Sequence, residues 1–283
     1  MKYVINIPNY SYFSEPENLI IFAKEVEKSG WDGLFMWDHL QLIPEFFRDI
    51  PFIDPYVALT IIACNTKNIL LGPYVTPISR RRPWQVYRQL VSLDHLSKGR
   101  IIFGVGLGTP AEFDFSAFGD ESDNIIRGEM LDESLEIIEL LSTGEEISYK
   151  GKHYNLNRVQ LLPRPYNGRI PIFVAGQWPN KNPFKRAAHY DGALPISKNW
   201  PETLHPKDIA QIKKYVMEFI EHKKSFDIVI GGISTVNRSQ ETLSQIEEYK
   251  KSGATWWVED MDTWDVSFEE MLERVRIGPP TIK

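Results

Sequence analysis

Hydrophobic and polar positions along the chain change period repeatedly, from the runs and alternation typical of strands to the spacing of amphipathic helices. Residues 2–7, KYVINI, have the composition of a buried strand, and apolar residues recur at helical spacing over the next predicted element, 16–30. The predicted strands are 2–7, 32–37, 68–77, 100–108, 170–176, 191–196, 226–232 and 254–260. The predicted helices are 16–30, 54–66, 83–97, 125–144, 183–190, 206–224, 239–253 and 267–278.

These elements form eight strand–helix units in succession. Strands that alternate with helices join through parallel crossovers, and eight such units in about 250 residues predict an α/β fold, a closed (β/α)8 TIM barrel. No linker or low-complexity block divides the chain, so we predict a single domain over residues 1–283. A small hairpin-like insertion is expected at about 145–168, where EEISYKGKHYNL alternates around a turn at Lys150–Gly151.

Composition and charge narrow the class of protein. Hydrophobic residues make up 42% of the 283 residues and the net charge is −6, so we expect no nucleic-acid or membrane partner. The start of the sequence lacks a signal-peptide core, and no apolar run approaches the ~18 residues of a membrane span, which predicts a cytoplasmic protein. With one cysteine, Cys64, and six scattered histidines, we expect no metal site and reject a metal-dependent hydrolase.

Residues 35–40, FMWDHL, end a predicted buried strand in an acid and an imidazole. Active sites of (β/α)8 barrels lie at the C-terminal ends of the strands, where Asp38 and His39 are expected. From position alone, two interpretations are equally good. The pair handles protons, or Asp38 caps a turn or helix and His39 is a hydrogen-bonded histidine at the rim.

The segment GVGLG places Gly104, Gly106 and Gly108 at every second position, so they share one face of the predicted strand. A face without side chains indicates close approach by a flat ligand or by another backbone segment. The dinucleotide-binding fingerprint requires its third glycine at another spacing and a helix that starts directly there, and the sequence has neither. Tight packing inside the barrel explains the glycines equally well.

Three further segments are candidates for binding an anion. Residues 79–83, SRRRP, could meet a phosphate or a polyanionic tail, but a charge run is usually a solvated face, and we prefer that interpretation. Residues 174–184, VAGQWPNKNPF, lead from a strand into a helix, whose N-terminus attracts anions. Positive charge is added there by Lys181, Lys185 and Arg186. Residues 230–232, IGG, could serve in the same way.

Taken together, these segments resemble the bacterial luciferase-like flavin oxidoreductases over nearly the whole chain. The similar stretches are GWDGLFMWDHL (30–40), 54–108, FGD (118–120), RGEMLDESLEIIELLSTG (127–144), GKHYNL (151–156), PIFVAG (171–176) and ERVRIGPP (273–280). Residues 93–108, LDHLSKGRIIFGVGLG, are highly specific to that family. One departure is that the sequence lacks the long insertion that luciferases carry after the seventh strand and use as a lid. The substrate of the luciferases therefore cannot be assigned to this chain.

The resemblance implies a luciferase-like (β/α)8 barrel that forms a homodimer and binds FMN or a deazaflavin at its C-terminal mouth. It places His39 beside the ring as the catalytic acid/base, and Asp38, from the same Asp-His pair, is the second catalytic candidate. It also implies a non-prolyl cis peptide between Tyr74 and Val75 that bulges against the ring. Further contacts are implied beside the ring for Gly106, Leu107 and Gly108, and at the phosphate or ribityl part for Ala175, Gly176 and Gln177.

Three functions remain open. The leading expectation is a monooxygenase that uses FMN on a small organic substrate, with reduced FMN supplied by a separate flavin reductase. The first alternative is a hydride-transferring dehydrogenase or reductase that depends on 8-hydroxy-5-deazaflavin, whose anionic tail the arginines at 80–82 could hold. The second alternative is a non-catalytic flavin-binding protein.

Overall fold

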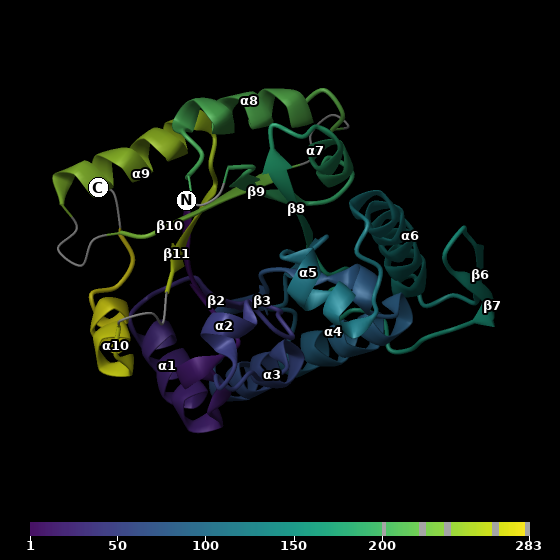
Figure 1. Ribbon diagram of the computed structural model, residues 1–283, viewed down its shortest axis with the longest axis horizontal. Helices are drawn as coiled ribbons and strands as arrows, with labels where there is room; N and C mark the ends of the chain where they lie inside the picture. Colours follow the sequence, from purple (N-terminus) through teal and green to yellow (C-terminus); the bar gives the residue numbers. More distant parts are fainter. Residues whose placement is uncertain (200–201, 221–224, 235–238, 262–265, 281–283) are drawn as a thin grey trace.

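The computed structural model describes residues 1–199, 202–220, 225–234, 239–261 and 266–280, and its centre is a parallel β-barrel (Figure 1). The barrel strands are β1 (Lys2–Ile7), β2 (Gly33–Met36), β3 (Leu70–Pro73), β4 (Thr76–Pro77), β5 (Phe103–Gly106), β8 (Ile172–Trp178), β9 (Gly192–Ser197), β10 (Asp227–Gly232) and β11 (Trp256–Asp260). They pair in the order β3-β2-β1-β11-β10-β9-β8-β5-β4. Because β3 and β4 are consecutive pieces of one strand position, the described residues supply eight positions.

The barrel closes between β3 and the segment that leads into β5. The backbone N–H of Leu71 donates to the carbonyl of Arg100 (3.1 Å), and the N–H of Ile102 donates back to Leu71 (2.9 Å). Beyond this bridge, β4 pairs with β5 in parallel. The predicted α/β class and (β/α)8 barrel are therefore confirmed, as a nearly closed parallel barrel.

Helices surround the barrel strands (Figure 1). The main helices are α1 (Pro16–Lys28), α3 (Pro55–Asn65), α4 (Pro83–Ser97), α6 (Asn124–Ser142), α7 (Asn182–Ala187), α8 (Pro206–Val216), α9 (Gln240–Ser252) and α10 (Phe268–Arg276). Several of them begin with proline, whose fixed φ and missing N–H suit the first helical position. The prediction for residues 206–224 was too long, because α8 ends at Val216 and residues 221–224 lie outside the described part.

Short helical segments occupy the loops at the barrel mouth and were not predicted. They are α2 (Pro44–Phe47), α5 (Ala111–Asp114), and the 3-10 turns η1 (Ser11–Ser14), η2 (Ile78–Arg80) and η3 (Ser116–Phe118). Segments of three or four residues span only about one helical turn, so apolar residues cannot recur along one face and hydrophobic spacing cannot reveal them.

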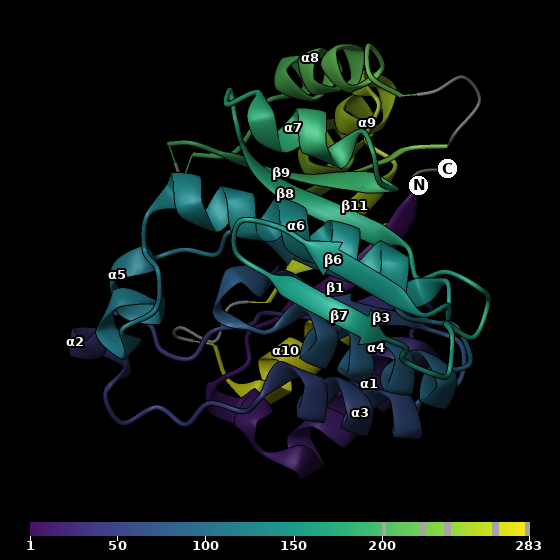
Figure 2. The ribbon, with the colours of Figure 1, turned by 90° about the vertical axis from the view of Figure 1, so that its right-hand side faces the viewer.

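The insertion after α6 forms an antiparallel pair, β6 (Ile147–Lys150) and β7 (Asn155–Val159). Figure 2 shows this hairpin on the outside of the molecule, against α6. The hydroxyl of Tyr149 donates to Glu136 of α6 (2.8 Å), which ties the hairpin to that helix. The strand–turn–strand pattern expected within residues 145–168 is thus present in the structure.

Two hydrophobic cores follow from the alternation of side chains along the strands. One core lies between the barrel and its helices. The other fills the barrel interior with Val4, Phe35, Ile102, Phe173, Leu194, Val229, Trp256 and Val258. This interior core is the floor beneath the C-terminal mouth. Within the described ranges, we find no helix that is both long and apolar enough to cross a bilayer.

Candidate active site

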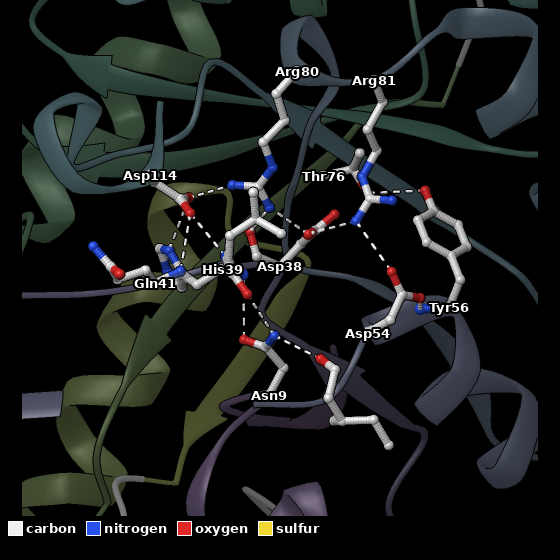
Figure 3. Close-up of polar contacts among 12 residues, drawn as sticks. Asn9, Asp38, His39, Gln41, Asp54, Tyr56, Thr76, Arg80, Arg81 and Asp114 are labelled. Atoms are coloured by element: carbon white, nitrogen blue, oxygen red, sulfur yellow. Dashed lines mark hydrogen bonds and ion pairs between the residues drawn. The ribbon is translucent and has the colours of Figure 1, made fainter. Parts of the chain in front are cut away.

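His39 lies directly beyond the C-terminal end of β2, and the backbone around it is held by Asn9 (Figure 3). The side-chain amide of Asn9 donates to the carbonyl of His39 (2.8 Å), and its oxygen accepts from the N–H of His39 (3.2 Å). Asn9 also donates to the carbonyl of Ile53 (2.9 Å). The imidazole packs edge-on against Trp37 with ring centroids 5.7 Å apart and keeps 18% of its surface exposed.

The ring of His39 is oriented by Asp114, which is fully buried at the end of α5. Nδ1 of His39 lies 3.2 Å from Oδ2 of Asp114, and the N–H of Leu40 donates to Oδ1 (2.8 Å). Because an ionised carboxylate only accepts, Nδ1 carries the proton and Nε2 of the neutral imidazole is left as the basic nitrogen.

Asp114 is ionised although it is buried. Burial alone would raise the pKa of Asp114, but the hydrogen bond from His39, the positive charge of Arg80 and the N–H of Leu40 together lower it below its ordinary value. Arg80 contacts Asp114 directly through Nη1. A negative charge is therefore fixed behind the imidazole.

The interpretation of residues 79–83 as a solvated charge run was wrong for Arg80 and Arg81. Nη2 of Arg80 donates to Oδ1 of Asp38 (2.6 Å), and the side chain of Arg80 is only 2% exposed. Nη2 of Arg81 donates to the same oxygen (2.9 Å) and lies 3.6 Å from Oδ2 of Asp54. Two buried acids require these guanidinium groups, so neither is free for an anionic cofactor tail.

Asp38 points into this ion-pair network, toward Arg80 and Arg81 (Figure 3). Burial alone would lower the pKa of Arg81, but the charge of Asp38 and the nearby Tyr56 raise it above its ordinary value. The helix-capping role considered for Asp38 belongs to Asp54, which accepts from the N–H groups of Tyr56 (2.9 Å) and Val57 (3.2 Å) at the start of α3. The network thus fixes the end of β2 to α3.

Three of the predicted cofactor contacts meet at one point in the mouth. The peptide between Tyr74 and Val75 is cis, where the resemblance placed it. A side-chain carbon on Gly106 would lie 3.0 Å from Cβ of Ala175 and 3.1 Å from Cγ2 of Val75. Because Gly106 has no side chain, Val75 and Ala175 pack closely around it, and the three residues form one continuous part of the barrel wall.

The other glycines of that strand have packing roles. A side chain on Gly104 would come within 2.2 Å of the carbonyl oxygen of Pro73, so here the tight-packing interpretation is confirmed. Gly108 has a φ of +80°, and a side chain there would lie 2.6 Å from Pro77. Leu107 packs against the outer core, and its carbonyl accepts from Arg127 (2.8 Å).

The residues predicted to meet the phosphate or ribityl part alternate between the two faces of β8. Gly176 lies on the outer face, where a side chain would come within 2.4 Å of Pro183 at the start of α7. Gln177 shares the inner face with Ala175 and is half-buried. Of these three predicted contacts, Ala175 and Gln177 therefore present side chains to the mouth.

The remaining anion candidates are engaged with other groups. Nζ of Lys181 lies 3.8 Å from the ring centre of Trp178, and Arg186 pairs with Asp132. Gly231 lies against a carboxylate, since a side chain there would be 2.9 Å from Oδ2 of Asp260. An anion would be repelled at that position, so the anion hypothesis for residues 230–232 does not fit.

Sequence analysis missed a polar group on the inner face of β1 and β11. Nδ2 of Asn6 donates to Oδ1 of Asp260 (2.8 Å). Burial raises the pKa of the Tyr74 hydroxyl above its ordinary value, and the negative charge of Asp260 raises it further, so Tyr74 is neutral. A signal for Asn6 exists in the sequence, because it interrupts an apolar strand at the inward position after Val4.

Among the described residues, no group of three or more His, Cys, Asp or Glu side chains is placed to hold a metal ion.

Comparison with known proteins identifies the family. Residues 5–267 match the sequence profile described as luciferase-like monooxygenase, and the chain belongs to this family. The chain is 26% identical over 246 residues, 85% of its length, to a 5,10-methylenetetrahydromethanopterin reductase of Archaeoglobus fulgidus, of which it covers 66%. It is 29% identical over 167 residues, 58% of its length, to an F420-dependent glucose-6-phosphate dehydrogenase of Nakamurella multipartita, of which it covers 48%.

Solved structures share the fold. An F420-dependent secondary alcohol dehydrogenase in complex with an F420–acetone adduct superposes with a TM-score of 0.77 at 16% identity, over 97% of both chains. The monooxygenase RslO1 of Streptomyces bottropensis superposes with a TM-score of 0.77 at 17% identity, over 98% of this chain and 97% of that one. The chain is thus a member of the luciferase-like family with its barrel fold, and it spans about two thirds of the first of these curated relatives and about half of the second.

Proposed function

We propose that the protein is an F420-dependent oxidoreductase that transfers hydride between the deazaflavin and a small alcohol or the corresponding carbonyl compound. F420 is an 8-hydroxy-5-deazaflavin, so this is the first alternative from the sequence, and it replaces the FMN-dependent monooxygenase as the leading hypothesis. The observation that carries the choice is the relatives' names, which specify F420-dependent dehydrogenases in both the sequence and the structure comparisons.

The wall formed by Val75, Gly106 and Ala175 fits a flat ring. A glycine between two small aliphatic side chains leaves a surface without projections, and one added carbon at Gly106 would already be in tight contact with both neighbours. We therefore assign one face of the ring to this wall. When bound, the deazaflavin would accept or donate a hydride, which carries two electrons.

We assign the proton to His39. In alcohol oxidation, the substrate's C–H bond gives up a hydride, its O–H bond gives up a proton to Nε2 of His39, and the carbon–oxygen bond becomes a carbonyl. Reduction is the reverse, with the proton returned from His39. Asp114 accepts the hydrogen bond of Nδ1–H, so it keeps Nε2 basic and stabilises the imidazolium once the proton has moved.

Asp38 acts as a positioning residue in this proposal. Its carboxylate holds Arg80, and Arg80 contacts Asp114, which in turn orients the ring of His39. The path from Asp38 to the imidazole therefore runs through two further side chains, and Asp38 itself touches no substrate.

The FMN-dependent monooxygenase remains the second candidate, supported by the fold shared with RslO1. It would need reduced FMN from a separate flavin reductase, whereas the dehydrogenase takes its hydride from the alcohol. For either chemistry we propose a small-molecule substrate. We also propose that the protein is a homodimer, and sedimentation velocity tests this oligomeric state directly.

The experiment is anaerobic incubation of the purified protein with oxidised F420 and a panel of small alcohols, followed by the absorbance of the oxidised cofactor. The proposal predicts alcohol-dependent loss of that absorbance and formation of the carbonyl product in equal amount. No F420 reduction, together with oxygen uptake when reduced FMN and a reductase are supplied, would contradict it and favour the monooxygenase.

A further inference from the structure

Asn6 is a buried polar side chain on the inner face of β1. It shares that face with Val4 of the interior core and is 1% exposed. Its Nδ2 donates to Oδ1 of Asp260 (2.8 Å). A carboxylate only accepts, so this contact fixes which end of the amide faces Asp260. Oδ1 of Asn6 is left buried with no hydrogen-bond partner.

An unpaired buried acceptor is unfavourable, because it has lost its hydrogen bonds to water without replacement. Apart from Asp260 on β11, the neighbouring inner positions are apolar, with Phe35 beside Asn6 on β2 and Val4 below it. A leucine would fill this place without that cost. The acceptor therefore indicates a donor that arrives with a ligand.

The position of β1 in the barrel indicates which ligand that is. The wall assigned to the ring consists of Val75 in the turn before β4, Gly106 on β5 and Ala175 on β8, and β4, β5 and β8 are neighbours in the barrel. His39 follows β2, and β2 is followed by β1 and β11 in strand order. Asn6 and Asp260 thus lie on the wall next to His39, away from the β5–β8 wall assigned to the ring, and face the substrate's side of the mouth.

The Asn6–Asp260 pair lies at the mouth end of its two strands. Asp260 ends β11, and its carboxylate lies so close to Gly231 on β10 that a side-chain carbon there would be 2.9 Å from Oδ2 of Asp260 and 3.7 Å from the hydroxyl of Tyr74. Asp260 and Tyr74 are both half-buried, so both are accessible from the mouth, and Asn6 lies next to Asp260 at the paired position of β1.

We propose that Asn6 accepts a hydrogen bond from the substrate, and that the substrate is an alcohol with a second hydrogen-bond donor, a hydroxyl or an amine. This inference rests on the proposed dehydrogenase function. The reacting hydroxyl faces His39 and the second donor faces Oδ1 of Asn6. Asp260 is a positioning residue, because it holds Nδ2 and so directs Oδ1 toward the ligand.

The test uses three matched alcohols: trans-1,2-cyclohexanediol, 2-methoxycyclohexanol and cyclohexanol. The methoxy compound has the same second oxygen as the diol but cannot donate from it. We expect kcat/KM for the diol to exceed that for the methoxy compound by about 10-fold to 100-fold, the range for leaving a buried acceptor unpaired. Trans-2-aminocyclohexanol distinguishes an amine from a hydroxyl as the preferred donor.

The decisive variant is Asn6→Leu, with Asn199→Leu, an exposed asparagine beyond β9, as the matched control. Asn6→Leu should bring the diol-to-methoxy ratio to within about 3-fold of one, and Asn199→Leu should keep the wild-type ratio. A wild-type ratio near one, or an unchanged ratio in Asn6→Leu, would overturn the inference. If Asn6→Leu does not fold, Asn6→Ala takes its place.

A second readout does not depend on turnover. Binding of the diol and of the methoxy compound to the protein loaded with F420 is measured by ligand-observed NMR, where the diol should bind about 10-fold more tightly and lose this preference in Asn6→Leu. Preferential diol binding without F420 reduction would contradict the dehydrogenase and retain the donor site. F420 reduction with equal binding of the two compounds would support the dehydrogenase and contradict the donor site.

Discussion

At the scale of single residues, the imidazole of His39 is fixed from two directions. Asn9 holds its backbone through two hydrogen bonds, and Asp114 holds Nδ1 of its ring. Asp114 is in turn held by Arg80, which also binds Asp38. A side chain restrained in this way can present one nitrogen to a substrate without losing further conformational freedom.

His39→Ala should lower kcat for alcohol oxidation by about 10²-fold to 10⁴-fold, because it removes the group that takes the hydroxyl proton. The affinity for F420 should stay within about 3-fold of wild type, since the ring wall is formed by other strands. Steady-state kinetics and a cofactor titration measure the two quantities. Unchanged turnover would show that His39 does not handle the proton.

The acid sensitivity of the fold should depend on Asp114. Its pKa is lowered in the folded state, so its contribution to stability is fully present above the unfolded value of about 3.9 and is lost as the pH falls through the lower folded value. Denaturant unfolding of wild type and Asp114→Asn at pH 7 and pH 3 measures this. We expect a smaller loss of stability on acidification in the variant; equal losses would contradict the assignment.

The sequence allowed His39 to be predicted, because it follows an apolar strand and so lies at the barrel mouth. It gave no signal for Asp114, which lies 75 positions away in a loop whose course no hydrophobic pattern describes. Arg80 and Arg81 were misjudged for a related reason. A run of charges is usually solvated, and the buried acids that change this are distant in sequence.

At the scale of elements, Arg100 joins α3 and α4 to the segment that leads into β5. Its guanidinium donates to the carbonyls of Ala63 (2.9 Å), Thr66 (3.1 Å) and Ile69 (2.8 Å), and its Nε donates to Ser97 (2.8 Å). These bonds satisfy carbonyls at and just beyond the C-terminal ends of both helices, where the backbone has no partners of its own.

Arg100→Lys should reduce the free energy of unfolding by about 2–3 kcal/mol, because an ammonium group cannot reach all of these carbonyls at once and some remain buried without a donor. Chemical denaturation measures the change. Arg169→Lys, at a half-exposed arginine, is the control and should shift stability by less than about 0.5 kcal/mol. Equal effects of the two substitutions would refute the role given to Arg100.

Two glycines on β5 should respond differently to alanine. Gly104→Ala puts a carbon 2.2 Å from the carbonyl oxygen of Pro73, so it should destabilise the barrel by about 3 kcal/mol or more. Gly106→Ala meets only Ala175 and Val75, at 3.0 and 3.1 Å, so it should cost about 1–2 kcal/mol and mainly weaken cofactor binding. Thermal unfolding and F420 titration separate the effects. Undiminished F420 affinity in Gly106→Ala would place the ring elsewhere.

The regular elements were predictable because their hydrophobic period matches the face they bury. Residues 2–7 and 83–97 form β1 and α4 with the predicted bounds. The strand that contains the glycines was predicted. Its sequence does not show that a backbone carbonyl packs against Gly104, whereas the side chains of Ala175 and Val75 pack against Gly106. That difference depends on the distance to a neighbouring strand, which pattern alone does not contain.

At the scale of the whole molecule, the barrel divides its mouth between two walls. The turn before β4 and strands β5 and β8 carry the wall assigned to the ring, whereas the end of β2 and strands β1 and β11 carry His39, Asn6 and Asp260. Strand order produces this division, since each wall is made of neighbouring strands. The family resemblance in the sequence predicted the scaffold and the ring side, whereas the polar group opposite came only from the folded chain.

The identity of the cofactor decides between hydride transfer and oxygen chemistry. The measurement is a titration of purified, cofactor-free protein with F420 and with FMN, each in oxidised and reduced form. We predict that F420 binds at least about 100-fold more tightly than FMN, a difference of about 2.7 kcal/mol. Tighter binding of FMN, above all of its reduced form, would contradict the account and return the protein to oxygen chemistry.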